Sequence, residues 1–260
     1  MLKSELRWIS ELGKNTPIIA ASCDLNGIWR GKRVPRANLE KVLEEGIRIP
    51  LSASCLDIWG SDLMNSPFLF ESGDADGYGL PTGVGPLPFF SNKKDSVLIP
   101  LWLFNNKKDI SPIDPRHILN SVWKKYEDLN LHPVIAFELE FYLLNENNFK
   151  NLKFDQYGFT NVLSTKDIEN HEVFFDELYD LCEKNNIPMD GISSENAPNQ
   201  FEINLKHTIN PLEAADHAIL FKRFIKGIAK RHEKRATFMA KPFPNIAGSG
   251  MHIHFSLLDI

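Results

Sequence analysis

The segment His132–Leu144 reads HPVIAFELEFYLL, and polar and apolar residues alternate through its middle. Successive side chains of a β-strand point to opposite faces, so Glu138 and Glu140 would share one face and their apolar neighbours the other. Two carboxylates side by side repel one another unless solvent or a cation separates them. A solvated sheet face is the ordinary explanation of a single pair, because charged residues usually stay exposed. The segment therefore predicts a strand with one acidic face and one apolar face.

A second pair of candidate ligands follows the same rule towards the end of the sequence. In MHIHF (Met251–Phe255), His252 and His254 would share one strand face, directly after Gly248-Ser249-Gly250. Imidazole binds several divalent metals, and the bare backbone amides of a glycine-rich tripeptide can meet an anion. A single histidine on a strand is more often structural, but two on one face beside such a tripeptide favour a site.

A third group surrounds a turn in SSENAPNQFEIN (Ser193–Asn204). Glu195 and Glu202 flank a loop that contains Pro198 and Asn199, and Glu202 lies on the outgoing strand. Carboxylates with one or two histidines suit a pair of hard divalent cations, and such cations neutralise transferring phosphoryl groups. Three groups of this kind in one region therefore predict a divalent metal site.

These motifs lie in a region where strands alternate with helices, which we take as a second domain over residues 109–260. Asp114-Pro115 and Asn210-Pro211 each predict the start of a helix, and apolar spacing predicts a third helix that ends before Asn185. Beyond the acidic strand, strands are expected at 200–205, 236–243 and 250–258.

The first 108 residues are richer in turns and predict a small α+β domain with an antiparallel or mixed sheet. Asn26-Gly27 between two extended stretches is a strong hairpin signal. A short helix is expected at 36–46 and a buried strand at 97–104. The segment 72–88 is dense in Gly, Pro and Asp, which predicts a loop.

The composition argues against several classes of partner. The 260 residues include 29 basic and 34 acidic ones, a net charge of −5, and no basic stripe suggests nucleic acid. No apolar run is long enough for a membrane span, and the first residues lack the apolar core of a signal peptide. Three widely spaced cysteines form neither a disulfide framework nor a thiolate metal site. These features predict a cytoplasmic protein without a membrane or nucleic-acid partner.

Three motifs at these spacings, FELEFYLL, ENAPNQFEIN and AGSGMHIHFSLLD, resemble the glutamine synthetase family. The similarity runs from about Asn15 to the end, and DLNGIWRGKRVP and IDPRHIL resemble its glutamate–amine ligase branch, which includes gamma-glutamylputrescine synthetase. The resemblance implies an α+β fold with a β-grasp-like N-terminal domain at 1–108. The first half of a catalytic domain, an antiparallel sheet with flanking helices, would follow at 109–260.

The resemblance also implies a set of metal ligands. Ligands of one metal are matched by Glu140, Glu195 and Glu202. Two of the three protein ligands of a second metal are matched by Glu138 and His252. The resemblance thus implies two Mg²⁺ or Mn²⁺ ions at each complete site.

Further positions match contacts to substrates. Nucleotide contacts are matched by Asp190, His254 and Ser256. Gly248 matches a backbone position beside the bound glutamate. Ala247 stands where glutamine-forming members usually have Asn, which favours an amine other than ammonia as the acceptor.

Two other positions differ from the family pattern or are hard to align. Asn199 replaces the usual Gly of its turn, and Asn tolerates left-handed backbone better than most residues. Asp57 is the candidate for the catalytic acidic residue near the amine entry, on a loop of the N-terminal domain. Asp74 and Asp76 are open to a structural interpretation instead.

The implied reaction is an ATP-dependent ligation. The γ-carboxylate of glutamate is activated as an acyl phosphate that ammonia or an amine attacks, and the metal ions stabilise the transferring phosphoryl group. The implied partners are glutamate, ATP, the amine and further copies of the chain in stacked rings. The family's catalytic domain continues beyond the strand at 250–258 with further ligands and arginines, so we expect this chain to be truncated and inactive alone.

Two other functions stay open at this point. The first is a non-catalytic truncated relative that binds metal or nucleotide weakly or associates with full-length subunits. The second is an unrelated His-x-His metalloenzyme on a β-barrel, which would need a further ligand after the histidine pair.

Overall fold

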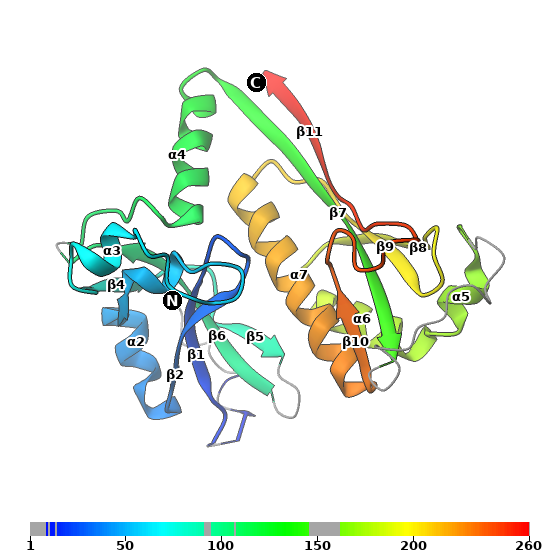
Figure 1. Ribbon diagram of the computed structural model, residues 1–260, viewed down its shortest axis with the longest axis horizontal. Coiled ribbons are helices and arrows are strands. Elements are labelled where there is room, and N and C mark those ends of the chain that lie inside the picture. The colour runs from blue at the N-terminus through cyan, green and yellow to red at the C-terminus, as the bar shows by residue number, and fades with distance from the viewer. Residues whose placement is uncertain are drawn as a thin grey trace. The chain divides into compact units, whose positions relative to one another are not determined.

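The computed structural model describes residues 9, 11–13, 15–90, 95–106, 108–145 and 162–259. They form two compact units, Met1–Lys124 and Lys125–Ile260 (Figure 1). The domain boundary proposed between residues 108 and 109 remains a prediction. Within the described ranges, no helix combines the length and the apolar character needed to cross a membrane.

The first unit is built on a mixed sheet with the strand order β2-β1-β6-β4-β3, and β5 also pairs with β6. Strands β1 and β6 run parallel and the other pairs run antiparallel, as the predicted mixed sheet requires. The strands are β1 (Ile18–Cys23), β2 (Trp29–Val34), β3 (Ile47–Pro50), β4 (Asp76–Pro81), β5 (Leu87–Phe90) and β6 (Asp95–Phe104). The helical segments are η1 (Arg36–Asn38), α2 (Leu39–Glu45), η2 (Leu51–Ser54), α3 (Pro67–Phe70) and α4 (Pro115–Glu127), which reaches into the second unit.

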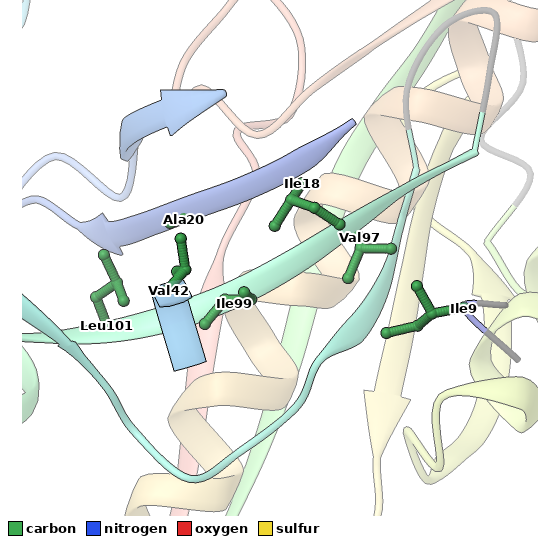
Figure 2. Close-up of a cluster of buried hydrophobic side chains, with 7 residues drawn as sticks. All are labelled: Ile9, Ile18, Ala20, Val42, Val97, Ile99 and Leu101. Atoms are coloured by element: carbon green, nitrogen blue, oxygen red, sulfur yellow. The ribbon is translucent and has the colours of Figure 1, made fainter. Parts of the chain in front are cut away.

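The core of this unit lies between the sheet and α2. Side chains at alternate positions of β6, namely Val97, Ile99 and Leu101, are buried against Ile18 and Val42. Figure 2 shows this cluster, in which Ala20 and Ile9 also take part. The predicted short helix and buried strand are therefore confirmed, since η1 and α2 cover residues 36–45 with Gly46 as the C-cap, and β6 contains residues 97–104.

The predicted hairpin at Asn26-Gly27 is also confirmed. Gly27 has a φ of 72°, which is the left-handed conformation that favours glycine. The Asp24 carboxylate accepts hydrogen bonds from the backbone N–H groups of Asn26 at 2.9 Å and Ile28 at 2.8 Å. It also accepts one from Arg30 Nε at 2.9 Å, so one buried aspartate holds the turn and the start of β2.

The prediction that residues 72–88 form a loop is wrong for residues 76–81 and 87–88. Residues 76–81 form β4 and β5 begins at Leu87. The glycines that suggested a loop allow close strand packing here. A Cβ at Gly77 would lie 2.4 Å from the Phe104 carbonyl oxygen, and one at Gly79 would lie 2.7 Å from a methyl group of Leu101.

The second unit has an antiparallel sheet with the order β10-β7-β9-β8, and β11 also pairs with β7. Strands β7 and β11 run side by side as a long ribbon (Figure 1). The strands are β7 (Leu131–Asn145), β8 (Met189–Ser194), β9 (Gln200–Leu205), β10 (Lys234–Thr237) and β11 (Met251–Asp259). The helices are α5 (Thr165–Glu169), α6 (Glu172–Lys184) and α7 (Pro211–Arg231).

Helices α6 and α7 bury the apolar face of this sheet. Phe201 of β9 contacts Phe141 of β7 and Phe175 of α6, with ring centroids 6.1 and 5.0 Å away. The Asn210 side chain accepts a hydrogen bond from the Glu213 N–H at 3.1 Å, which caps α7 as predicted. Because side chains alternate, burial of Leu139 and Phe141 leaves Glu138 and Glu140 on the opposite face.

The strand predicted at 236–243 is shorter than expected. β10 ends at Thr237, and Pro242 and Pro244 follow in the sequence. Proline lacks an N–H and cannot continue a ladder of hydrogen bonds. The chain instead turns back over the sheet, and the Phe243 ring packs edge-on against Tyr142 at 5.4 Å.

Candidate metal centre

The register of three neighbouring strands brings the predicted acidic and imidazole residues together. Glu138 on the central strand β7 lies opposite His252 on β11. Glu140, two residues further along β7, lies opposite Glu202 on β9. Residues that are far apart in the sequence therefore meet on one face of the sheet.

Both histidines of the pair bind the same carboxylate. His252 Nδ1 lies 2.6 Å from Glu138 Oε1, and His254 Nε2 lies 3.0 Å from Glu138 Oε2. Partial burial by itself would raise the pKa of Glu138. The hydrogen bonds from His254, His252 and Glu202 outweigh burial and lower this pKa to about 2. The same carboxylate raises the pKa of His252, so a charge pair is favoured at this position.

The pKa of Glu202 is shifted in the opposite direction, upwards. Burial, a hydrogen bond with Glu138 and the charges of Glu138 and Glu195 raise the pKa of Glu202 to about 7. One ligand atom from each of Glu138, Glu202 and His252 lies within 4.8 Å of the others. Glu202 beside Glu138 thus holds a proton more tightly than an ordinary glutamate, and a divalent cation could replace that proton. Two carboxylate oxygens and one imidazole nitrogen fit Mg²⁺ or Mn²⁺.

Glu140 borders this cluster from the other side. Its Oε2 accepts a hydrogen bond from Gln200 Nε2 at 3.1 Å. A Cβ at Gly250 would lie 2.8 Å from Glu140 Oε1 and 3.3 Å from His252 Nε2, so both of these atoms lie beside the same glycine. The Glu140 N–H donates to the Gly250 carbonyl at 3.1 Å, which fixes the two segments together.

Glu195 begins the turn that leads into β9. Its N–H donates to the Gln200 carbonyl at 2.8 Å, and Asn199 in this turn has the left-handed φ of 59° that its side chain tolerates. The Asn199 side-chain oxygen lies 3.2 Å from His171 Nε2. Glu195 is near enough for its charge to raise the pKa of Glu202. The assignment of individual ligands to two separate ions remains a prediction.

Two buried polar residues that were not singled out in the sequence hold the segment 247–250 in place. The Tyr142 hydroxyl donates to the Ala247 carbonyl at 2.5 Å, and Gln200 Nε2 donates to the Gly248 carbonyl at 2.8 Å. Burial and the charge of Glu140 raise the pKa of Tyr142 to about 12, so this hydroxyl stays a donor. Strand alternation could have indicated Gln200, because it shares a face with Glu202.

The remaining predicted residues lie in different places. Asp190 lies on β8, and Ser256 lies on β11 opposite Val134. The His254 ring contacts the His207 ring edge-on, with centroids 6.0 Å apart. Nucleotide contacts at these positions remain predictions, as do the substrate contacts of Ala247 and Gly248.

Asp57 lies in the first unit, where its carboxylate stabilises a turn. Its Oδ1 accepts hydrogen bonds from the N–H groups of Trp59 and Ser61, both at 2.8 Å. Asn26 also donates to the neighbouring Leu56 carbonyl at 2.9 Å. The structure thus shows a structural use of Asp57, and its catalytic role remains a prediction.

The chain belongs to the glutamine synthetase family, because residues 112–259 match the family described as glutamine synthetase, catalytic domain. It resembles gamma-glutamylputrescine synthetase PuuA of Escherichia coli (strain K12), with 35% identity over 249 residues, 90% of this chain and 51% of the relative. It also resembles glutamate–isopropylamine ligase of Pseudomonas sp, with 30% identity over 259 residues, 91% of this chain and 53% of the relative. The chain spans about half the length of the curated relatives it matches.

Solved structures agree on the fold. A glutamine synthase homologue superposes with a TM-score of 0.79 at 22% identity, over 95% of this chain and 56% of that chain. Ligand-free GmaS gives a TM-score of 0.79 at 24% identity, over 99% of this chain and 56% of that chain. The expected family and its α+β architecture are therefore confirmed.

Proposed function

We propose that this chain contributes the metal centre and part of the nucleotide site of an ATP-dependent ligase that joins the γ-carboxylate of glutamate to an amine. The observation that carries the proposal is the cluster of Glu138, Glu202 and His252, whose ligand atoms lie within 4.8 Å of one another. Family membership supports the reaction type, since two relatives are named gamma-glutamylputrescine synthetase and glutamate–isopropylamine ligase.

The proposed ligands would hold two divalent ions, whose positive charge would stabilise a phosphoryl group during transfer. The first ion is assigned to Glu140, Glu195 and Glu202, and the second to Glu138 and His252. The chain's own hydrogen bonds prepare these ligands. Glu138 binds Nδ1 of His252, so Nε2, which lies beside Gly250, is the nitrogen that would bind the ion in place of a proton.

The backbone at 247–250 would bind the glutamate substrate. The carbonyls of Ala247 and Gly248 are taken up by Tyr142 and Gln200, which fixes the orientation of both peptide groups. A Cβ at Gly248 would lie 2.6 Å from the Ala240 carbonyl oxygen, so only glycine allows this close approach. The segment therefore offers a rigid edge to a substrate beside the metal centre.

We infer that the acceptor is an alkylamine or polyamine rather than ammonia. Ala247 stands at a position where the glutamine-forming members usually have Asn, and two of the most similar relatives are named for putrescine and isopropylamine. We further propose that the protein works in the cytoplasm as a homo-oligomer of stacked rings. Cys23, Cys55 and Cys182 form no disulfide with one another, which supports a reducing compartment.

Metal binding tests the centre directly. We expect the purified chain to bind Mn²⁺, which is measured from the loss of the free-Mn²⁺ signal in electron paramagnetic resonance. We also expect bound Mn²⁺ to strengthen the binding of a non-hydrolysable ATP analogue. Glu138→Ala should remove the Mn²⁺ ion assigned to Glu138 and His252 and so lower the amount of Mn²⁺ bound. Glu177→Gln is the matched control, because Glu177 pairs with Arg231 and His232 on the helices instead. An equal amount of Mn²⁺ bound by Glu138→Ala and by the unmodified chain would overturn the proposal.

The reaction is tested in the native protein that carries this chain. We expect glutamate-dependent phosphate release from ATP to be faster with putrescine or isopropylamine than with ammonia. Ammonia as the best acceptor would refute the amine preference and leave the ligase intact. A relative without turnover would bind Mn²⁺ but release no phosphate, so the two assays separate these functions.

A further inference from the structure

We propose that Gln200 is a positioning residue that locks the Glu140 carboxylate and the Gly248 carbonyl into one fixed arrangement. The inference rests on the proposed function of the same site. It adds a residue that neither binds the metal nor touches the substrate but sets the geometry of both binding elements at once.

The side-chain amide of Gln200 is fully used within the protein. Gln200 is only 1% exposed. Its Nε2 group donates to Glu140 Oε2 at 3.1 Å and to the Gly248 carbonyl at 2.8 Å, while its Oε1 accepts from the Ala197 N–H at 3.1 Å. One amide thus joins β7, the turn before β9 and the segment 247–250.

The contact with Glu140 selects which carboxylate oxygen faces the metal cluster. Oε2 is held by Gln200, so Oε1 is the oxygen left beside Gly250 and near His252 Nε2. A hydrogen bond to a carboxylate is stronger and more directional than one between neutral groups. Partners of this kind behind a metal ligand commonly change metal affinity by about 10–100-fold when they are removed.

The hydrogen bond from Gln200 to the Gly248 carbonyl also fixes the backbone of the segment 247–250. Gly248 packs closely against the neighbouring backbone, because a Cβ at this position would lie 2.6 Å from the Ala240 carbonyl oxygen. The Ser249 N–H also donates to that carbonyl at 2.9 Å. Loss of the Gln200 amide would therefore release the carboxylate and the backbone together.

Gln200→Met tests this role, because methionine has a similar shape and cannot form the three hydrogen bonds. In the full chain we expect about 10–100-fold weaker Mn²⁺ binding by electron paramagnetic resonance. The melting temperature should fall more than in Glu177→Gln, which breaks a partly exposed ion pair between α6 and α7, so Mn²⁺ binding is measured at a temperature at which circular dichroism shows both variants folded. Gln200→Glu should weaken Mn²⁺ binding as well, because it places a second carboxylate against Glu140. Mn²⁺ affinity within twofold of the unmodified chain in Gln200→Met would overturn the proposal.

A measurement on the unmodified chain covers the case in which the variants do not fold. The side-chain N–H resonances of Gln200 should shift when Mg²⁺ is added. Those of Asn185, which donates to the Leu181 carbonyl at 2.8 Å, should not. No shift of the Gln200 resonances at saturating Mg²⁺ would overturn the proposal. If the unmodified chain binds no Mn²⁺, both the proposed function and the role of Gln200 are refuted. Normal Mn²⁺ binding in Gln200→Met refutes only the role of Gln200.

Discussion

Replacing Glu202 with glutamine should stabilise the metal-free protein at pH 8 and at the same time remove its response to Mn²⁺. Burial and the charges of Glu138 and Glu195 raise the pKa of Glu202 to about 7 from an ordinary value of 4.5. The folded protein therefore holds this proton more tightly than the unfolded chain. Its contribution to stability is fully present below pH 4.5 and is lost as pH rises through about 7.

The size of the effect follows from this difference in pKa. Each unit corresponds to ~1.4 kcal/mol, which gives an upper bound of about 3 kcal/mol at pH 8. Because Glu202 is partly exposed, solvent screening reduces the expected gain in Glu202→Gln to roughly 1–2 kcal/mol. A unit of this size should then melt about 3–6 °C higher.

Thermal unfolding by circular dichroism with a chelator, at pH 5 and pH 8, measures this gain. Glu202→Gln should melt higher than the unmodified chain at pH 8, and the gain should be much smaller at pH 5, where Glu202 is protonated in the folded protein. Mn²⁺ should then raise the melting temperature of the unmodified chain only. Glu183→Gln, which changes an exposed carboxylate on α6, is the control and should show no gain dependent on pH. A lower melting temperature of Glu202→Gln at pH 8, or an equal gain at pH 5, would refute the reasoning.

The Mn²⁺ affinity of the unmodified chain should fall by up to about tenfold per pH unit below pH 7, because the cation competes with the proton on Glu202. Above about pH 8 the affinity should no longer change with pH. Mn²⁺ titrations across this range check the slope, and an affinity that does not change with pH contradicts the prediction. Gly250→Ala should weaken Mn²⁺ binding, because its Cβ would lie 2.8 Å from Glu140 Oε1, whereas Gly191→Ala, with nothing within 4 Å, should not. Asn199→Ala should lose about 1 kcal/mol in urea unfolding because φ is 59°, and Asn199→Gly should lose less; equal losses would show that the turn is not strained.

The strand at His132–Leu144 could be predicted because alternation is a local property of the chain. The same is true of the hairpin at Asn26-Gly27 and of the capped start of α7. The segment 72–88 misled the prediction because glycine has two uses, and composition does not distinguish a flexible turn from a strand that needs close contact. Neighbouring residues in the sequence do not reveal that Gly77 lies against Phe104.

The meeting of Glu138, Glu202 and His252 could be predicted from the sequence, whereas the residues that hold the site in place could not, and the ligand roles stay predictions. Glu138 and His252 were found because each belongs to a pair on one strand face. Gln200 and Tyr142 were missed because their partners lie 60 and 105 residues away in the sequence, Glu140 and Ala247 respectively. The perturbed pKa of Glu202 also depends on packing between strands, which the sequence alone does not specify.

Pulsed electron paramagnetic resonance of bound Mn²⁺ tests the central claim most directly, because it detects nitrogen ligands. If one of the two ions binds to Glu138 and His252, the unmodified chain saturated with Mn²⁺ should show ¹⁴N coupling from an imidazole. His252→Ala should lose that coupling, while a histidine on helix α7, in the variant His217→Ala, should leave it unchanged. Bound Mn²⁺ without ¹⁴N coupling, or coupling that persists in His252→Ala, would contradict the account.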